Sequence, residues 1–273
     1  MTRFVCILVL VLIGGVPASA AELQYPLSIA AAADGTLYLA DRNLPGVWQV
    51  TAEGTLSVYF QASKKFRTPL NAVRCVAVDA KGRLLAGDSS TCQVFRFDEQ
   101  KQPQPLAKGR IGIPMAIAFN SAGEILVSDL EIHQVVKIPE AGGELVKVTE
   151  SQACRGIAVD KDDRLWILGR EKLTRFDKGQ TETILNGHPF KFPHTIALDD
   201  AGNAYVSDNY AKAVFKIDPM GTATPFAQGA PFVGPVGICR HNGKLYVADP
   251  QAKAVFVLAE DGKVTRLELK PQT

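Results

Sequence analysis

The sequence predicts an all-β fold, a six-bladed β-propeller with four antiparallel strands in each blade. Two observations predict it. The chain repeats itself about every forty residues, and each repeat holds several short apolar runs of strand length. Six segments align on a common Ile or Val, and the spacings between these residues are 47, 41, 40, 39 and 42. The aligned residues are Ile29, Val76, Ile117, Ile157, Ile196 and Ile238. A β-sandwich would not require such regular internal similarity.

Each repeat begins with two expected strands joined by a tight turn. A first apolar run is followed by a turn rich in Asp and Gly, such as Asp34-Gly35 or Asn242-Gly243, and then by a second apolar run. Asn and Asp tolerate the left-handed conformation that a tight hairpin needs, and Gly completes it. The first run is apolar at consecutive positions, which is expected of an inner strand packed between two neighbouring blades.

A third and a fourth strand complete each expected blade. Third strands are expected at 46–51, 92–98, 133–139, 172–177, 212–218 and 253–259. A weaker fourth run follows, as at 55–60 and 181–186. Two ways of closing the ring stay open, because the last blade is either complete in itself or completed by residues 21–25.

The repeat resembles a known family. The segment "PHTIALDDAGNAYVSDNYAKAVFKI" at 193–217 is similar to the NHL repeat, and the pattern recurs over residues 21–273. The resemblance implies one propeller domain over this range. NHL-type propellers include enzymes, ligand binders and protein-interaction platforms, so the resemblance leaves the function open.

Residues 1–20 have the composition of a secretory signal peptide. Arg3 precedes an apolar run from Phe4 to Val16, and Ala18-Ser19-Ala20 is a small-residue cleavage signal. The run is shorter than the roughly 18 residues of a membrane span. We therefore expect an exported protein, periplasmic or extracellular, without a transmembrane anchor after cleavage.

The charge balance argues against nucleic-acid binding. The whole chain carries a formal net charge of +2, and removal of residues 1–20 takes away Arg3 and no acid. A chain so close to neutral lacks the excess of cations that general phosphate binding uses.

The mouth of the central channel, where the first strands begin, is the expected ligand site. The residue two before each aligned Ile or Val should line this mouth, which gives Leu27, Arg74, Met115, Arg155, His194 and Val236. Arg74 and Arg155 carry guanidinium groups, which suit a carboxylate or a phosphate. The alternative is that both arginines pair with nearby acids such as Glu131 or Glu171. We expect Arg74, Arg155, His194 and Met115 to bind a protein, a peptide or a small acidic ligand.

An enzyme is the competing function. The stretch "FPHTIAL" resembles the strand start that carries zinc-binding histidines in peptidylglycine amidating lyase, with His194 at the matching position. The corresponding starts "IPMAIAF" and "GPVGICR" hold Met115 and Val236, whereas catalytic zinc needs three protein ligands. We therefore predict neither a metal site nor a cofactor, since a divalent metal would lack a full ligand set.

A second enzyme family gives the same result. The chain is similar to gluconolactonase and regucalcin, six-bladed hydrolases whose first inner strand begins near a metal-binding Glu. Here the first blade begins "YPLSIAAAAD", without a Glu. His194 remains the one candidate catalytic residue, as a general base in a hydrolase or lyase.

A recurring Asp closes the second strand of five blades. These residues, Asp41, Asp88, Asp129, Asp208 and Asp249, are expected to accept hydrogen bonds from their own turns. Blade four has Gly169 instead, followed by a shorter loop, which we expect to lower the rim beside Arg155.

Four cysteines follow the expected signal peptide: Cys75, Cys92, Cys154 and Cys239. Cys75 and Cys92 should lie near the same face of blade two, on strands about 9.5 Å apart. A disulfide needs Cα atoms within about 7 Å, so the loop before Cys92 would have to fold inward. The resemblance to the amidating lyase implies such a bridge, and both states stay open. Cys154 and Cys239 are expected to be small buried side chains.

Overall fold

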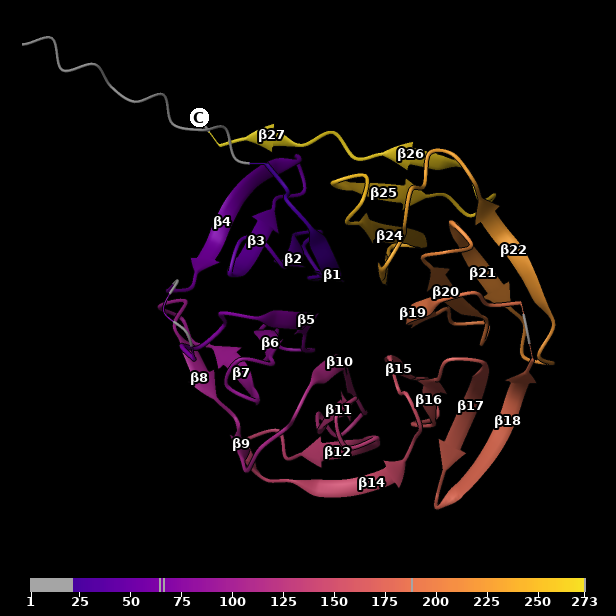
Figure 1. Cartoon of the computed structure of the whole chain (residues 1–273), viewed down its shortest axis with the longest axis horizontal. Helices are drawn as coiled ribbons and strands as arrows, with labels where there is room; N and C mark the ends of the chain where they lie inside the picture. The colour runs from indigo at the N-terminus through magenta and orange to yellow at the C-terminus, as the bar shows by residue number, and fades with distance from the viewer. Residues whose placement is uncertain (1–21, 64, 66, 188, 273) are drawn as a thin grey trace, which may run out of the picture.

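The computed structural model describes residues 22–63, 65, 67–187 and 189–272. The expected signal peptide lies outside the described residues. Within them the chain forms six four-stranded antiparallel blades arranged in a ring (Figure 1), which confirms the predicted fold class. No helix in this part of the chain is long and apolar enough to span a membrane.

The strands of each blade follow one another in sequence. Blade one consists of β1 (Pro26–Ala31), β2 (Leu37–Asp41), β3 (Gly46–Val50) and β4 (Thr55–Gln61). Blade two consists of β5 (Val73–Val78), β6 (Leu84–Asp88), β7 (Gln93–Phe97) and β8 (Pro103–Pro105). Blade three consists of β10 (Pro114–Phe119), β11 (Ile125–Asp129), β12 (Gln134–Ile138) and β14 (Val146–Glu150).

The second half of the ring repeats this order. Blade four consists of β15 (Gly156–Val159), β16 (Leu165–Leu168), β17 (Lys172–Asp177) and β18 (Gln180–Asn186). Blade five consists of β19 (Pro193–Leu198), β20 (Ala204–Asp208), β21 (Ala213–Ile217) and β22 (Ala223–Gln228). Blade six consists of β23 (Gly237–His241), β24 (Lys244–Asp249), β25 (Ala254–Leu258) and β26 (Val264–Arg266). The short strands β9 (Ala107–Lys108) and β13 (Gly143–Glu144) pair between blades two and three.

The first strand of every blade lies innermost. In Figure 1 the strands β1, β5, β10, β15, β19 and β23 surround the centre of the ring, and each contacts the corresponding strand of the next blade. All six therefore begin at the same end of the channel, which we call the start face. The loops between second and third strands lie on this face too, because each second strand runs antiparallel to the first.

The core lies between blades rather than within them. The described residues form six clusters of buried apolar side chains, one at each junction of neighbouring blades. At the junction of blades four and five, for example, Trp166 and Leu168 of β16 pack with Ile196 of β19 and Val206 of β20. A single blade could not bury both of its faces, so the repeats depend on one another.

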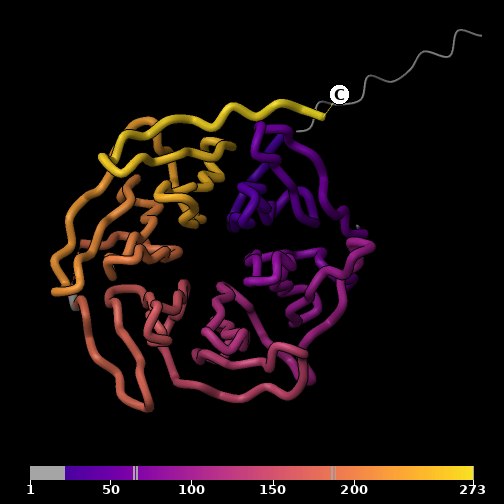
Figure 2. Tube along the Cα trace, turned by 180° about the vertical axis from the view of Figure 1, so that it is seen from behind, coloured from indigo at the N-terminus to yellow at the C-terminus, as the bar shows by residue number. Residues whose placement is uncertain are grey.

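The ring is closed by the C-terminal segment. Blade six is complete in itself, and residues 22–25 form no strand. The segment after β26 crosses to blade one, where β27 (Lys270–Pro271) pairs in parallel with β4. Figure 2 shows the yellow C-terminal segment lying along the indigo first blade. Leu267 and Leu269 pack into the cluster between blades six and one.

The recurring aspartates hold the start face together. Asp208 accepts hydrogen bonds from the backbone N–H groups of Lys191, Phe192 and Ala211. The bond from Ala211 comes from the turn after Asp208, as predicted, and those from Lys191 and Phe192 come from the segment that leads into β19. The same double connection occurs at Asp41, Asp88, Asp129 and Asp249. Each Asp therefore ties the two loops of its blade on this face.

Candidate functional site

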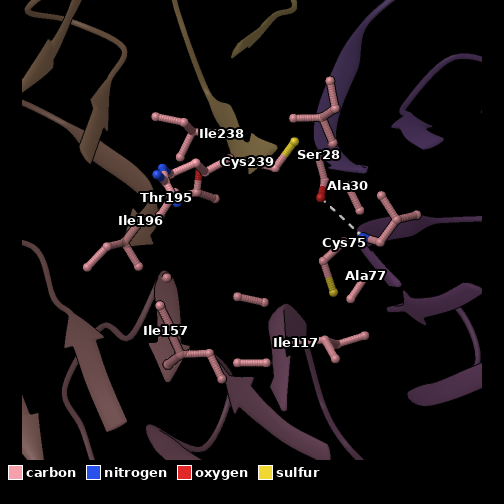
Figure 3. Close-up of a pocket in the computed structure, with 18 of the residues that line it drawn as sticks. Ser28, Ala30, Cys75, Ala77, Ile117, Ile157, Thr195, Ile196, Ile238 and Cys239 are labelled. Carbon is pink, nitrogen blue, oxygen red and sulfur yellow. Dashed lines mark hydrogen bonds between the residues drawn. The ribbon is translucent and has the colours of Figure 1, made fainter. Parts of the chain in front are cut away.

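The central channel has a volume of about 340 Å³ and is lined mainly by small and aliphatic side chains from the six inner strands (Figure 3). Its polar side chains connect neighbouring blades. Ser28 Oγ accepts a hydrogen bond from the Val76 N–H at 3.1 Å, and Thr195 Oγ1 donates to the Val236 carbonyl at 2.6 Å. The Ser28 and Thr195 hydroxyl groups are therefore engaged in hydrogen bonds between blades, and they are poorly placed to act as catalytic groups.

In four of the six blades a β-bulge lies at the start of the first strand. The pairing of first and second strands shifts at this point in blades one, two, three and five. Leu27, Arg74, Met115 and His194 therefore fall within the shifted positions. A bulge leaves a residue unpaired and turns its side chain away from the regular pleat. In blades four and six the backbone N–H groups of Arg155 and Val236 still bond to the second strand.

Arg155 and His194 meet at the junction of blades four and five. The Arg155 guanidinium carbon lies 4.1 Å from the centroid of the Phe192 ring. The Phe192 ring stacks on Tyr210 at 4.7 Å with 18° between the planes, and it meets the His194 ring edge-on at 4.9 Å. Phe192 is thus the common contact of a cation, an imidazole and a phenol that come from two blades.

The positive charge of Arg155 has no acidic partner among the described residues. Its Nε is buried without a hydrogen-bond partner, and no ion pair or hydrogen bond joins its guanidinium to another described residue. Burial, together with the charge of Arg170, lowers the pKa of Arg155. The acids that the alternative assigned to the two arginines bind elsewhere, since Glu131 pairs with Arg110 and Glu171 lies 3.9 Å from Arg170.

His194 is held neutral over the ordinary pH range. Burial, and then the positive charge of Arg155, lower the pKa of His194 from 6.5 to about 4. A neutral imidazole next to a cation keeps a free nitrogen lone pair, which can accept a hydrogen bond or a proton.

The lowered pKa of His194 predicts a loss of stability in acid. In the unfolded chain the imidazole is protonated below pH 6.5, whereas in the folded chain it stays neutral down to about pH 4. The unfolded state therefore binds more protons in this window, and stability falls as the pH falls through it. Between pH 7 and pH 4 the unfolding free energy of the wild type should fall by roughly 3 kcal/mol more than that of His194→Gln.

Urea unfolding at both pH values measures this difference. His133→Gln is the matched control, because His133 is exposed on the loop after β11, and it should lose as much as the wild type. Equal losses in His194→Gln and the wild type would contradict the assignment of a neutral, half-buried imidazole.

Arg74 and Met115 lie on blades two and three, away from this cluster. The Arg74 side chain is exposed, and its Nε donates to Ser89 Oγ of the same blade at 3.0 Å. Met115 lines the channel. The structure therefore joins Arg155 with His194, while Arg74 and Met115 occupy another part of the same mouth.

The side chains that could bind a metal ion lie apart from one another in the described residues. In the described part of the chain no three His, Cys, Asp or Glu side chains converge in a way that could hold a metal ion. His194, the histidine matched to the zinc-binding position, has an aromatic ring as its neighbour rather than a second ligand.

The disulfide between Cys75 and Cys92 is not formed, which corrects the bridged alternative. All four described cysteines are free. The Cys75 thiol points to blade three and donates to the Pro114 carbonyl, whereas Cys92 Sγ lies 3.7 Å from the Ser89 carbonyl in its own turn. Because β6 separates β5 from β7, the two sulfurs face different neighbours. Burial raises the pKa of the Cys75, Cys154 and Cys239 thiols to about 12.

Sequence reasoning missed Phe192. The residue stands two positions before His194 in "FPHTIAL", where Pro193 separates it from the expected mouth position. Tyr210 belongs to the same blade, but its stacking on Phe192 requires the two loops that Asp208 holds together.

Comparison with known proteins identifies the fold but no family. No family model matches the sequence, and no curated protein matches it. Among solved structures, a gluconolactonase from Xanthomonas campestris has a TM-score of 0.74 at 17% identity, covering 90% of this chain and 88% of that chain. Virginiamycin B lyase from Staphylococcus aureus has a TM-score of 0.69 at 14% identity, covering 93% and 89%.

A third similar structure is not described as an enzyme. A chain from a complex of nidogen and laminin has a TM-score of 0.69 at 16% identity, covering 88% of this chain and 91% of that chain. At such identities the likeness shows the six-bladed propeller fold alone. The similar propellers include enzymes and a protein that binds another protein, so the choice of function depends on the site.

Proposed function

We propose that this chain is an exported, NHL-type propeller that acts as a binding module. Its ligand site lies at the start face, at the mouth of the central channel. Arg155 and His194 form the centre of the site, and Arg74 and Met115 extend it across blades two and three. The ligand is a protein, a peptide or a small molecule that presents a carboxylate or a phosphate.

The observation that carries the proposal is the unpaired, stacked guanidinium of Arg155. Half-buried arginines ordinarily have an acidic partner, because an unpaired charge is costly away from water. Here the Phe192 ring holds the guanidinium from one side at 4.1 Å, and the described residues leave it without an acid. A bound anion would supply the missing charge through the paired donors of the guanidinium.

Arg155→Ala is expected to weaken binding of an acidic ligand by about tenfold or more, which corresponds to about 1.4 kcal/mol. Arg155→Lys should recover only part of the affinity, because an ammonium group lacks the paired donors and the flat stacking surface. Isothermal titration with acetate, citrate and a synthetic acidic peptide measures both variants. Glu260→Ala, on the opposite face, is the control. Unchanged affinity in Arg155→Ala for every acid that the wild type binds would refute the site.

A hydrolase or lyase at the same mouth is the second candidate. It is favoured by the neutral His194 beside the positive Arg155, since a base and a stabiliser of developing negative charge then lie together. In the described residues His194 has no hydrogen-bonded nucleophile. Turnover of a lactone or another electrophile that is lost in His194→Ala, with folding preserved, would favour this function over the binding module.

A further inference from the structure

The start face exposes apolar side chains over blades five and six. Tyr210 is 65% exposed and Val233 is 41% exposed, although both are large and apolar or aromatic. The two loops that carry them are joined across the junction of the blades, because the buried Asn209 donates from Nδ2 to the Gly234 carbonyl at 3.1 Å. With Phe192 and Arg155 these two residues span blades four to six, and we call the four residues the docking strip.

The backbone under the docking strip is firmly held. Asp208 accepts from the N–H groups of Phe192 and Ala211, on either side of the Phe192–Tyr210 stack. Asp249 accepts from the N–H groups of Val233 and Gly234, both at 2.8 Å. Exposed apolar side chains on loops that are already ordered lose little further freedom when a partner binds.

Exposed lysines lie on the loops that carry the docking strip and on the neighbouring blade-six loop. Lys191 precedes Phe192 and Lys212 follows Tyr210 by two residues, while Lys253 lies in the blade-six loop, where it lines a pocket together with Glu22 and Glu268. All three are exposed, and in the described part of the chain none of their side chains has an ion pair or a hydrogen bond. The acid in the neighbouring blade-four loop is Glu171, which lies 3.9 Å from Arg170.

On blades one to three, the described arginines of the start face contact neighbouring side chains. This part of the face exposes Ile132, but the nearby Arg110 pairs with Glu131. Arg74 bonds to Ser89, and the guanidinium of Arg42 lies over the Tyr25 ring at 5.9 Å. On blades five and six, exposed lysines without an ion pair among the described residues therefore lie on the same loops as exposed aromatic and aliphatic side chains.

We propose that the docking strip binds an acidic polypeptide segment that carries an aromatic or aliphatic side chain. The inference rests on the proposed function and names the partner of that site. Aromatic residues and Arg at the centre, surrounded by polar groups, are typical of protein-binding surfaces. The exposed lysines complement carboxylates on the partner. The aliphatic Val233 favours a polypeptide over a nucleic acid, which is recognised through phosphates and stacked bases.

The test uses a fluorescein-labelled synthetic peptide of alternating Glu and Ser with two Tyr residues. Fluorescence anisotropy is measured with the whole protein. The triple variant Lys191→Glu/Lys212→Glu/Lys253→Glu reverses the charge of the three lysines. It is expected to bind the peptide about thirtyfold more weakly, because three favourable charge contacts become repulsive. The matched control Arg42→Glu/Lys65→Glu/Arg110→Glu changes the net charge equally on blades one to three and should stay within about threefold.

Two further variants separate the charges from the apolar contacts. Lys191→Gln/Lys212→Gln/Lys253→Gln removes the charges without repulsion, and is the variant to measure if the reversed protein unfolds. Tyr210→Ser/Val233→Ser keeps every charge and should still weaken peptide binding by about tenfold, since two exposed anchors are lost. Unchanged affinity in this variant would overturn the docking strip, because attraction between charges alone would then explain binding.

The outcomes distinguish this inference from the proposed function. If Arg155→Ala abolishes binding of citrate while both charge-reversed triple variants bind the peptide equally well, the docking strip is wrong and the binding site stands. If Arg155→Ala changes nothing, the proposed function is wrong. Tighter binding of oligothymidine or of phosphatidylglycerol vesicles than of the peptide, with the same dependence on the three lysines, would overturn the assignment of a polypeptide partner.

Discussion

Asp208→Ala is expected to lower the free energy of unfolding by about 4 kcal/mol, because several buried or partly buried N–H donors lose their acceptor at once. The carboxylate is fully buried and accepts from the N–H groups of Lys191 at 2.6 Å and of Phe192 and Ala211 at 2.9 Å. Asp208→Asn keeps one acceptor oxygen and should lose less. Equilibrium unfolding in urea measures both variants.

The same substitution should also disturb the candidate site. Asp208 holds the segment before β19 against the turn after β20, and these two carry Phe192 and Tyr210. Binding of an acidic ligand at temperatures where the variant stays folded should therefore weaken as well. Asp200→Ala is the control, because Asp200 is exposed and forms a surface ion pair with Arg240, so its loss should cost less than about 1 kcal/mol. A similar cost for the two alanine variants would contradict the role given to the recurring aspartates.

Leu267→Ala/Leu269→Ala is expected to lower the free energy of unfolding by about 3 kcal/mol, since each half-buried leucine loses apolar contacts and leaves a cavity. Both side chains pack into the cluster between blades six and one, which includes Leu56, Trp48 and Val255. The effect should reach the whole ring rather than one blade, because neighbouring blades bury one another's faces.

The neighbouring residues of the closing segment provide the control. Glu268 and Lys270 are exposed, so Glu268→Ala/Lys270→Ala should change the unfolding free energy by less than about 0.5 kcal/mol. Thermal unfolding, monitored by circular dichroism, compares the melting temperatures of the two double variants. Equal melting temperatures would show that β27 and its flanking leucines contribute nothing to closure of the ring.

The structure confirms the blades that the sequence predicts, because their signals are local. Turns such as Asp34-Gly35 and Asn242-Gly243 join strands that are neighbours in the chain, and apolar runs mark the strands themselves. The closing strand was not predicted. β27 is two residues long and pairs in parallel with β4, which lies at the other end of the sequence, so no nearby turn or regular spacing indicates it.

The candidate site was predicted in part for the same reason. The repeat placed Arg155 and His194 at equivalent positions of neighbouring blades, which was enough to expect both at one mouth. It did not indicate Phe192, which lies just outside the repeated position and contacts Arg155 across the junction of two blades. The disulfide alternative for Cys75 and Cys92 was wrong because neighbouring blades decide where a thiol points.

The number of blades, the order of their strands and the residues expected at the mouth of the channel follow from patterns that recur along the chain, so they can be predicted from the sequence. The closure of the ring, the state of the cysteines and the surroundings of Arg155 could be learned only from the folded chain. Each of these depends on contacts between blades, and such contacts join residues that no local pattern relates. The neutral state of His194 also depends on contacts between blades, because its pKa is lowered by burial and by the positive charge of Arg155 on the neighbouring blade.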